Sequence, residues 1–83
     1  MSYMHRRDVD VAATGRTIGR YKSLNHLSIP ELADILHCST QAVRSWLRGE
    51  CLPTDNHLDA LAEIFGVYTE DLVSFRGAET EVR

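Results

Sequence analysis

Polar side chains suited to paired hydrogen bonding gather in one short segment, at Thr40, Gln41, Arg44 and Ser45. A Gln amide can form two hydrogen bonds with the major-groove edge of adenine, and an Arg guanidinium can do the same with guanine. Thr and Ser hydroxyls can bond to either base or to a phosphate. None of the four is acidic, so none repels a phosphate. If one helix face presents them together, they can read DNA bases.

The segment from Thr40 to Arg48 is predicted to be that helix. Val43 and Trp46 lie three residues apart, which turns both toward one inner side. Ser39 is suited to cap the start of the helix and Gly49 to end it. With its apolar side against a core, the helix presents the four polar residues outward.

A second short helix is predicted immediately before it. Ser28-Ile29-Pro30-Glu31 has the pattern of a capping box, in which the Ser hydroxyl accepts from an early N–H and the Glu side chain reaches back. Pro30 fits in the first turn, where its missing N–H would have no helical partner. The apolar residues between positions 32 and 36, which are Leu32, Ala33, Ile35 and Leu36, are predicted to form a buried side. Ala33 is small enough to let the next helix cross closely.

One folded domain is predicted, with a segment at each end. Residues 1–12 mix charge, Met and Tyr without strong periodicity, so we expect a flexible arm or a frayed extension of the first helix. Thr14 is suited to cap a first helix that ends near Leu24 to His26. Residues 76–83 form a polar tail, which leaves residues 13–75 as the domain.

Two more helices follow. After a loop containing Pro53, Thr54 or Asp55 is suited to cap a helix that ends at Gly66. Thr69 is suited to cap a last short helix. No strand-like alternation competes with these patterns. The sequence predicts an all-α, compact five-helix bundle in which the second and third helices form a helix-turn-helix.

Phosphate contacts need donors on both sides of a groove. The starts of the second and third helices offer backbone N–H groups and the positive end of the helix dipole. The third helix adds a guanidinium at its far end. We therefore expect contacts to phosphates from Ser28, Ile29, Ser39 and Arg48.

The overall charge gives these contacts little help. The chain of 83 residues has a formal charge of −3, whereas non-specific DNA binding relies on Lys and Arg. Residues 1–50 carry seven Lys and Arg against five Asp and Glu, and residues 51–83 carry two against seven, so the two parts are +2 and −5. Either this asymmetry gives the protein one basic face and one acidic face, or the charges are distributed over the surface without functional meaning.

Other function classes find little support. No apolar run is long enough to span a membrane and no secretory signal is present, so we expect a cytoplasmic protein. His37, Cys38, Cys51 and His57 lack the spacing of a structural zinc site, so we expect no metal or other cofactor. No nucleophile, base and oxyanion donor are grouped, so an enzyme is not expected.

Residues 14–73 resemble the repressor/Cro-like helix-turn-helix family, also called the xenobiotic response element family. The resemblance extends beyond the two-helix motif into the helices on either side, which makes it specific. In order along the chain, the matching residues are Leu27-Ser28, Glu31-Leu32-Ala33-Asp34-Ile35-Leu36, Ser39-Thr40-Gln41-Ala42-Val43-Arg44-Ser45-Trp46, Arg48-Gly49, Pro53, Leu58, Leu61-Ala62, Phe65-Gly66-Val67 and Asp71-Leu72.

The resemblance implies a lambda repressor-like domain whose third helix enters the major groove, commonly as two copies on a symmetric operator. By position, it implies the same residues as the side-chain chemistry does. The base-reading residues are Thr40, Gln41, Arg44 and Ser45, and the phosphate-binding residues are Ser28, Ile29, Ser39 and Arg48. Family members are mostly transcriptional repressors or regulators of bacteria, phages and mobile elements, and some are antitoxins. We expect a homodimeric repressor that binds double-stranded DNA. The alternative is an antitoxin or a protein-interaction module with a protein partner.

Three residues depart from the family pattern. His37 and His26 stand where Gly is usual, so each must adopt a positive φ or the turn must differ. Leu47 replaces a Glu that commonly pairs with an Arg at the place of Lys22, so that ion pair cannot form. These changes affect turn geometry and stability more than the outer face of the third helix.

Dimerisation is expected because a short reading surface gains affinity by doubling. Apolar residues toward the C-terminal end can form an interface between two copies or simply close the core. These residues are Phe65, Val67, Tyr68, Val73 and Phe75.

Overall fold

The computed structural model describes residues 9–75, so residues 1–8 of the arm expected over residues 1–12 lie outside the described part, as does the expected tail over residues 76–83. The helices of this part are α1 (Val11–Leu24), α2 (Ile29–Leu36), α3 (Thr40–Leu47), α4 (Asp55–Phe65) and α5 (Thr69–Leu72). The predicted all-α, five-helix architecture is confirmed. None of these helices is long and apolar enough to cross a membrane.

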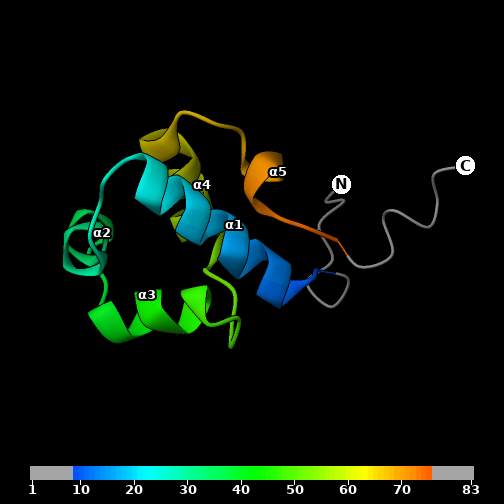
Figure 1. The fold of residues 1–83 in the computed structure, drawn as a ribbon, viewed down its shortest axis with the longest axis horizontal. Helices are drawn as coiled ribbons and strands as arrows, with labels where there is room; N and C mark the ends of the chain where they lie inside the picture. The colour runs from blue at the N-terminus through cyan, green and yellow to red at the C-terminus, as the bar shows by residue number, and fades with distance from the viewer. Residues whose placement is uncertain (1–8, 76–83) are drawn as a thin grey trace, which may run out of the picture.

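Helix α1 runs through the middle of the molecule, with α3 along one side and α4 and α5 on the other (Figure 1). Helix α2 closes one end and packs against both α3 and α4. Each of the five helices contributes buried apolar side chains, and a fully buried Val, Leu, Ile or Phe among them stabilises the fold by about 1.5–3 kcal/mol. These core residues are Ile18, Leu32, Ala33, Leu36, Val43, Trp46, Leu58, Leu61, Ala62, Phe65 and Leu72.

The start of α1 differs from the prediction. Asp10 caps the helix by accepting a hydrogen bond from the Ala13 N–H at 3.0 Å. Thr14 is fully buried inside α1, where its hydroxyl accepts from the Ser74 N–H at 3.1 Å. The prediction of Thr14 as cap was wrong because its partner lies 60 residues away, beyond the reach of local sequence patterns.

The N-terminal residues of the described part also belong to the fold. Val9 is buried and forms an antiparallel bridge with Phe75, and the Asp10 N–H donates to the Ser74 carbonyl oxygen at 2.7 Å. Residues 9–12, which the sequence assigned to a flexible arm, are therefore ordered against the end of the domain. The cause is again a contact between distant parts of the chain.

The predicted capping residue is confirmed for α4 and is wrong for α5. Thr54 caps α4 by accepting from the His57 N–H at 3.3 Å. Thr69 does not cap α5, because its hydroxyl donates to the Asp59 carboxylate on α4 at 3.2 Å. Instead, the Asp71 carboxylate accepts from the Tyr68 N–H at 3.0 Å. The Thr69 hydroxyl reaches Asp59 because α4 lies beside α5, and this placement is not visible in the local sequence.

Two glycines of α1 face α3. At Gly15 the backbones approach so closely that a Cβ atom would clash with the carbonyl oxygen of Trp46. At Gly19, one turn later, a Cβ atom would lie at an ordinary 3.5 Å from the end of the Leu47 side chain. Ala33, predicted as the small residue at the crossing of α2 and α3, is buried. Gly15 was not recognised from the sequence, although it controls how near α3 lies to α1.

We expect Gly15→Ala to destabilise the protein and Gly19→Ala to stabilise it. Alanine favours a helix by about 1 kcal/mol over glycine at either position. At Gly15 this gain is outweighed by overpacking against a backbone oxygen that cannot rotate away, at a cost of about 1–3 kcal/mol or more. Urea unfolding followed by circular dichroism measures both. Equal stabilisation by the two variants would contradict the close approach of α1 and α3.

Candidate DNA-binding interface

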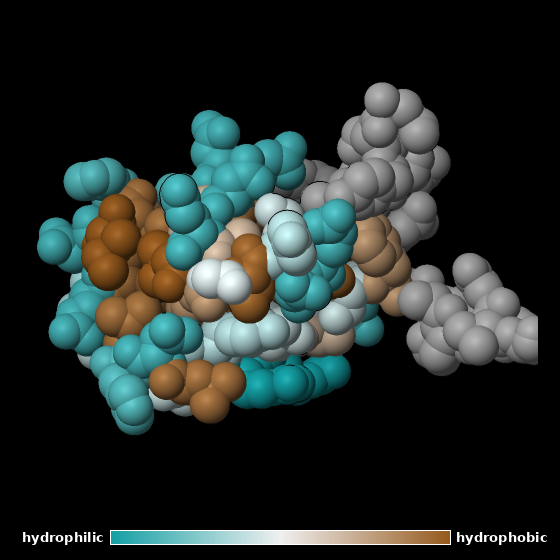
Figure 2. Space-filling model, turned by 90° about the horizontal axis from the view of Figure 1, so that it is seen from above, coloured by the Kyte–Doolittle hydropathy of each residue, from teal (hydrophilic) through white to brown (hydrophobic). Residues whose placement is uncertain are grey.

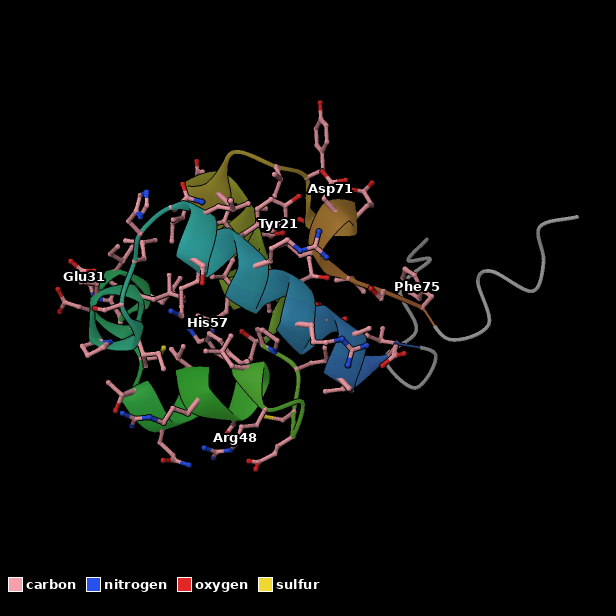
Figure 3. All side chains as sticks on the ribbon, viewed as in Figure 1. Tyr21, Glu31, Arg48, His57, Asp71 and Phe75 are labelled. Carbon is pink, nitrogen blue, oxygen red and sulfur yellow. The ribbon has the colours of Figure 1, made fainter. Side chains whose placement is uncertain are left out.

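Helix α3 is anchored on its inner side. Val43 is fully buried, and the largely buried Trp46 ring contacts the ring of His57 from α4 in a tilted arrangement, with the centroids 5.3 Å apart and 49° between the ring planes. Figure 3 shows His57 between α3 and α4, while Arg48 projects away from the core at the outer edge of α3. The opposite side of the helix is therefore free to meet another molecule.

The predicted base-reading residues lie together on α3, but they differ in availability. Gln41 and Arg44 are exposed, whereas Thr40 and Ser45 are half-buried. The Arg44 Nη1 lies 3.5 Å from the Thr40 hydroxyl oxygen. The Ser45 hydroxyl donates to the Gln41 carbonyl oxygen at 3.0 Å, so it is turned back onto the helix. Base contact by these four residues stays a prediction, with Gln41 and Arg44 the best placed.

The start of α3 is suited to an anion. The Ser39 hydroxyl accepts from the Ala42 N–H at 3.0 Å, which confirms it as the cap. The first backbone hydrogen bond of the helix comes from the Val43 N–H at 3.3 Å, so the N–H groups of Thr40 and Gln41 precede it. The first turn contains no acidic residue. Helix geometry thus leaves donors and an unopposed dipole at this end.

The start of α2 is capped as predicted, but it already holds a negative charge. The Ser28 hydroxyl accepts from the Glu31 N–H at 3.1 Å, and the Ser28 N–H donates to the Glu31 carboxylate at 2.8 Å. The hydrogen bonds from the Ser28 backbone and hydroxyl lower the pKa of the Glu31 carboxyl, so it stays ionised at neutral pH. Phosphate contact by Ser28 and Ile29 stays a prediction, and any phosphate there has to approach beside this carboxylate.

The turn between α2 and α3 forms without glycine. His37 adopts φ 57° and ψ 45°, the left-handed conformation, so of the two alternatives left open by the sequence the turn keeps its usual geometry. The Cys38 N–H donates to the Ala33 carbonyl oxygen at 3.0 Å, and the His37 N–H donates to that of Asp34 at 3.2 Å. This pair of bonds is the usual end of a helix with a left-handed residue. His26, after α1, likewise has φ 56°.

Lys22 has an alternative partner in place of the absent ion pair. Its ammonium group donates to the Leu27 carbonyl oxygen at 3.2 Å and so ties the end of α1 to the start of α2. Leu47, which stands at the other position of that pair, is half-buried against the core. An apolar contact to α1 thus stands where an ion pair is common.

Arg48 does not stand alone at the end of α3. Its Nε lies 2.9 Å from Oε2 of Glu50, and its Nη2 lies 3.4 Å from Oε1. This hydrogen-bonded ion pair lowers the pKa of the Glu50 carboxyl and raises the pKa of Arg48. Glu50 was missed in the sequence, because a spacing of two residues does not usually bring side chains together. Phosphate contact by Arg48 stays a prediction.

Metal binding has no support within residues 9–75. No group of three or more His, Cys, Asp or Glu residues there is arranged to hold a metal ion. Cys38 is a half-buried free thiol whose pKa is raised by desolvation, and Cys51 is an exposed free thiol. The part of the chain that the structure describes also contains no pocket for a small ligand.

The sequence pattern of the helix-turn-helix family (HTH_3) matches residues 20–72, more than half of the chain. The chain belongs to this helix-turn-helix family. The match covers α2, the turn, α3 and the two later helices, so the helix-turn-helix spans the surface described above. It identifies a DNA-binding domain of a family that is typically non-enzymatic. A comparison with curated proteins gave no match.

The helix-turn-helix fold also resembles a solved structure. The restriction-modification controller protein C.AhdI from Aeromonas hydrophila superimposes with a TM-score of 0.69. The two sequences are 19% identical, and the alignment covers 76% of this chain and 96% of the controller protein. At this identity the likeness establishes the lambda repressor-like fold and no more.

We expect His37→Gly to stabilise the helix-turn-helix domain by about 0.5–1 kcal/mol. A non-glycine residue in the left-handed region costs about 1–2 kcal/mol, part of which is offset by the greater entropy that glycine has in the unfolded chain. Thermal unfolding measures the change. Asn56→Gly, on an exposed turn of α4, is the control and should destabilise. Destabilisation by both variants would mean that the His37 conformation is not strained.

Proposed function

We propose that this protein binds double-stranded DNA sequence-specifically and regulates transcription by inserting α3 into the major groove. The observation that carries the proposal is the exposure of Gln41 and Arg44, three residues apart, on the outer side of a helix whose inner side is anchored by Val43 and Trp46. A rigid helix that presents an amide and a guanidinium together is suited to reading base edges.

Gln41 and Arg44 are assigned the two bidentate contacts, to adenine and to guanine respectively. Thr40 lies within 3.5 Å of the Arg44 guanidinium and can support it from the start of the helix. Ser45 needs to release its bond to the Gln41 carbonyl oxygen before it can contact a base. The reading surface therefore rests mainly on two side chains.

The phosphate contacts are assigned to both helix starts and to the end of α3. Ser39 and the free N–H groups that follow it provide the strongest position, since no carboxylate opposes an anion there. Ser28 and Ile29 are assigned a second contact beside Glu31. Arg48 is assigned the third contact, although its positive charge is offset by the carboxylate of Glu50.

We further propose that the protein acts as a cytoplasmic homodimeric repressor on a symmetric operator. The structurally similar chain described above is a restriction-modification controller protein, which supports a regulatory role. Exposed apolar residues away from α3 support a second copy as partner, with Leu24 exposed to 65% and Tyr68 to 77%. Figure 2, which looks onto the side opposite α3, shows apolar residues gathered toward the end where α2 lies. By contrast, Phe65 and Val73 close the core.

A protein-interaction module or antitoxin is the second candidate, and one observation favours it. Residues 51–75 contain five acidic side chains and no Lys or Arg. All five lie exposed on α4 and α5, namely Asp55, Asp59, Glu63, Glu70 and Asp71. Such a face suits a basic protein partner. It leaves α3 free, so the two functions are compatible.

Selection of preferred duplexes from a random pool at near-physiological salt tests the proposal. Enrichment of a sequence with two inverted half-sites is expected, and its insertion in a reporter promoter should lower transcription when the protein is present. Affinity should fall steeply as salt rises. If no duplex is retained even at low salt, DNA binding fails and the protein-interaction function is favoured.

Changing Gln41 or Arg44 to Ala should weaken binding to the selected duplex by about 1–3 kcal/mol and relax the base preference at one position each. Arg44→Lys is the matched control, since it keeps the charge but loses the fork that binds guanine. It should relax specificity while the salt dependence stays as in the wild type. Fluorescence anisotropy with duplexes changed one base pair at a time measures both. Unchanged discrimination in both alanine variants would refute the reading role of α3.

A further inference from the structure

The chain leaves α3 through a turn that brings a carboxylate back to the last cation of the helix. Gly49 adopts φ 76°, and the Glu50 N–H donates to the Ser45 carbonyl oxygen at 2.9 Å. The positive φ of Gly49 and this hydrogen bond place the Glu50 backbone next to the end of α3. The Glu50 side chain then meets the Nε and Nη2 of Arg48 through two hydrogen bonds, at 2.9 and 3.4 Å.

The pair lies in solvent at the edge of the proposed DNA surface. The side chains of Arg48 and Glu50 are exposed to 48% and 56%, and Arg48 points away from the core (Figure 3). Between residues 40 and 50 the cations are Arg44 and Arg48, and the acidic residue is Glu50. Glu50 therefore cancels half of the positive charge that this segment can offer to DNA.

We propose that Glu50 limits the sequence-independent part of DNA binding by neutralising Arg48. The proposal rests on the proposed function. A neutral pair can still donate a hydrogen bond to a phosphate, because the guanidinium has five N–H groups and Glu50 engages one edge. It does not replace a counterion of the DNA, since its net charge is zero.

This charge balance does not depend on whether the pair survives in the complex. An exposed ion pair contributes little stability, so a phosphate can compete with Glu50 for the guanidinium. If Arg48 turns to a phosphate, the Glu50 carboxylate remains nearby and needs its own cation from solution. In either arrangement the two residues together release no counterion.

The test measures how the logarithm of the binding constant changes with the logarithm of salt concentration. The probes are the duplex selected above and a mixed-sequence duplex, both fluorescently labelled. Glu50→Gln should steepen the slope by about 0.9, so that affinity falls about threefold more than in the wild type between about 50 and 200 mM salt. At the lowest salt it should bind the mixed-sequence duplex several-fold more tightly.

The double variant Arg48→Gln with Glu50→Gln decides between the pair and a free cation. Two neutral amides replace a neutral pair, so its slope should equal that of the wild type. The control Glu63→Gln changes the total charge equally, but it lies in the later half of α4, away from α3 (Figure 1). Its slope should stay close to that of the wild type. Circular dichroism verifies that each variant is folded, as the exposure of all three positions leads us to expect.

Two results would overturn the inference. In the first, Glu50→Gln leaves the slope unchanged and the double variant is shallower than the wild type by about 0.9, which would mean that Arg48 already acts as a full cation. In the second, Glu63→Gln steepens the slope as much as Glu50→Gln does, which would assign the effect to total charge. Absence of any binding by the wild type at low salt is a different outcome, since it refutes the proposed function and the inference with it.

Discussion

The contact between the backbones of α1 and α3 at Gly15 constrains the rest of the structure. With no Cβ atom at this position, α3 lies directly against α1 through the carbonyl group of Trp46. The Trp46 side chain then reaches the core and His57 on α4. The inner side of α3 is therefore set by α1, α2 and α4 together. The direction in which Gln41 and Arg44 project follows from that placement.

The charges around α3 are arranged unevenly for a protein that meets an anion. The start of α3 has no acidic residue, whereas the start of α2 carries Glu31 and the end of α3 carries Glu50. Attraction from Arg44 and the helix dipole is thus balanced by two carboxylates at the margins. In the proposed complex with DNA, such a surface would depend on hydrogen bonds to bases more than on phosphate charge, and this balance would favour sequence-specific over general affinity.

Caps whose partners lie three residues away were predictable from the sequence. Ser28, Ser39 and Thr54 each bond to the third residue after them. The sequence left open whether His37 takes a positive φ or the turn differs, and the structure shows the positive φ. Thr14 and Thr69 looked equally suited to capping. Both predictions were wrong because Thr14 bonds to a residue 60 positions away and Thr69 to one 10 positions away, which no local pattern contains.

The sequence by itself determined the order of the helices, the family, and which polar residues share the outer side of α3. These depend on spacing within single helices, and the period of a helix converts spacing into direction. Only the tertiary structure decided that α3 packs directly against Gly15, that residues 9–12 pack against the end of the domain, and that the Glu50 side chain forms an ion pair with Arg48. Each of these results from packing or from the path of a turn, which places groups together without a periodic signal in the sequence.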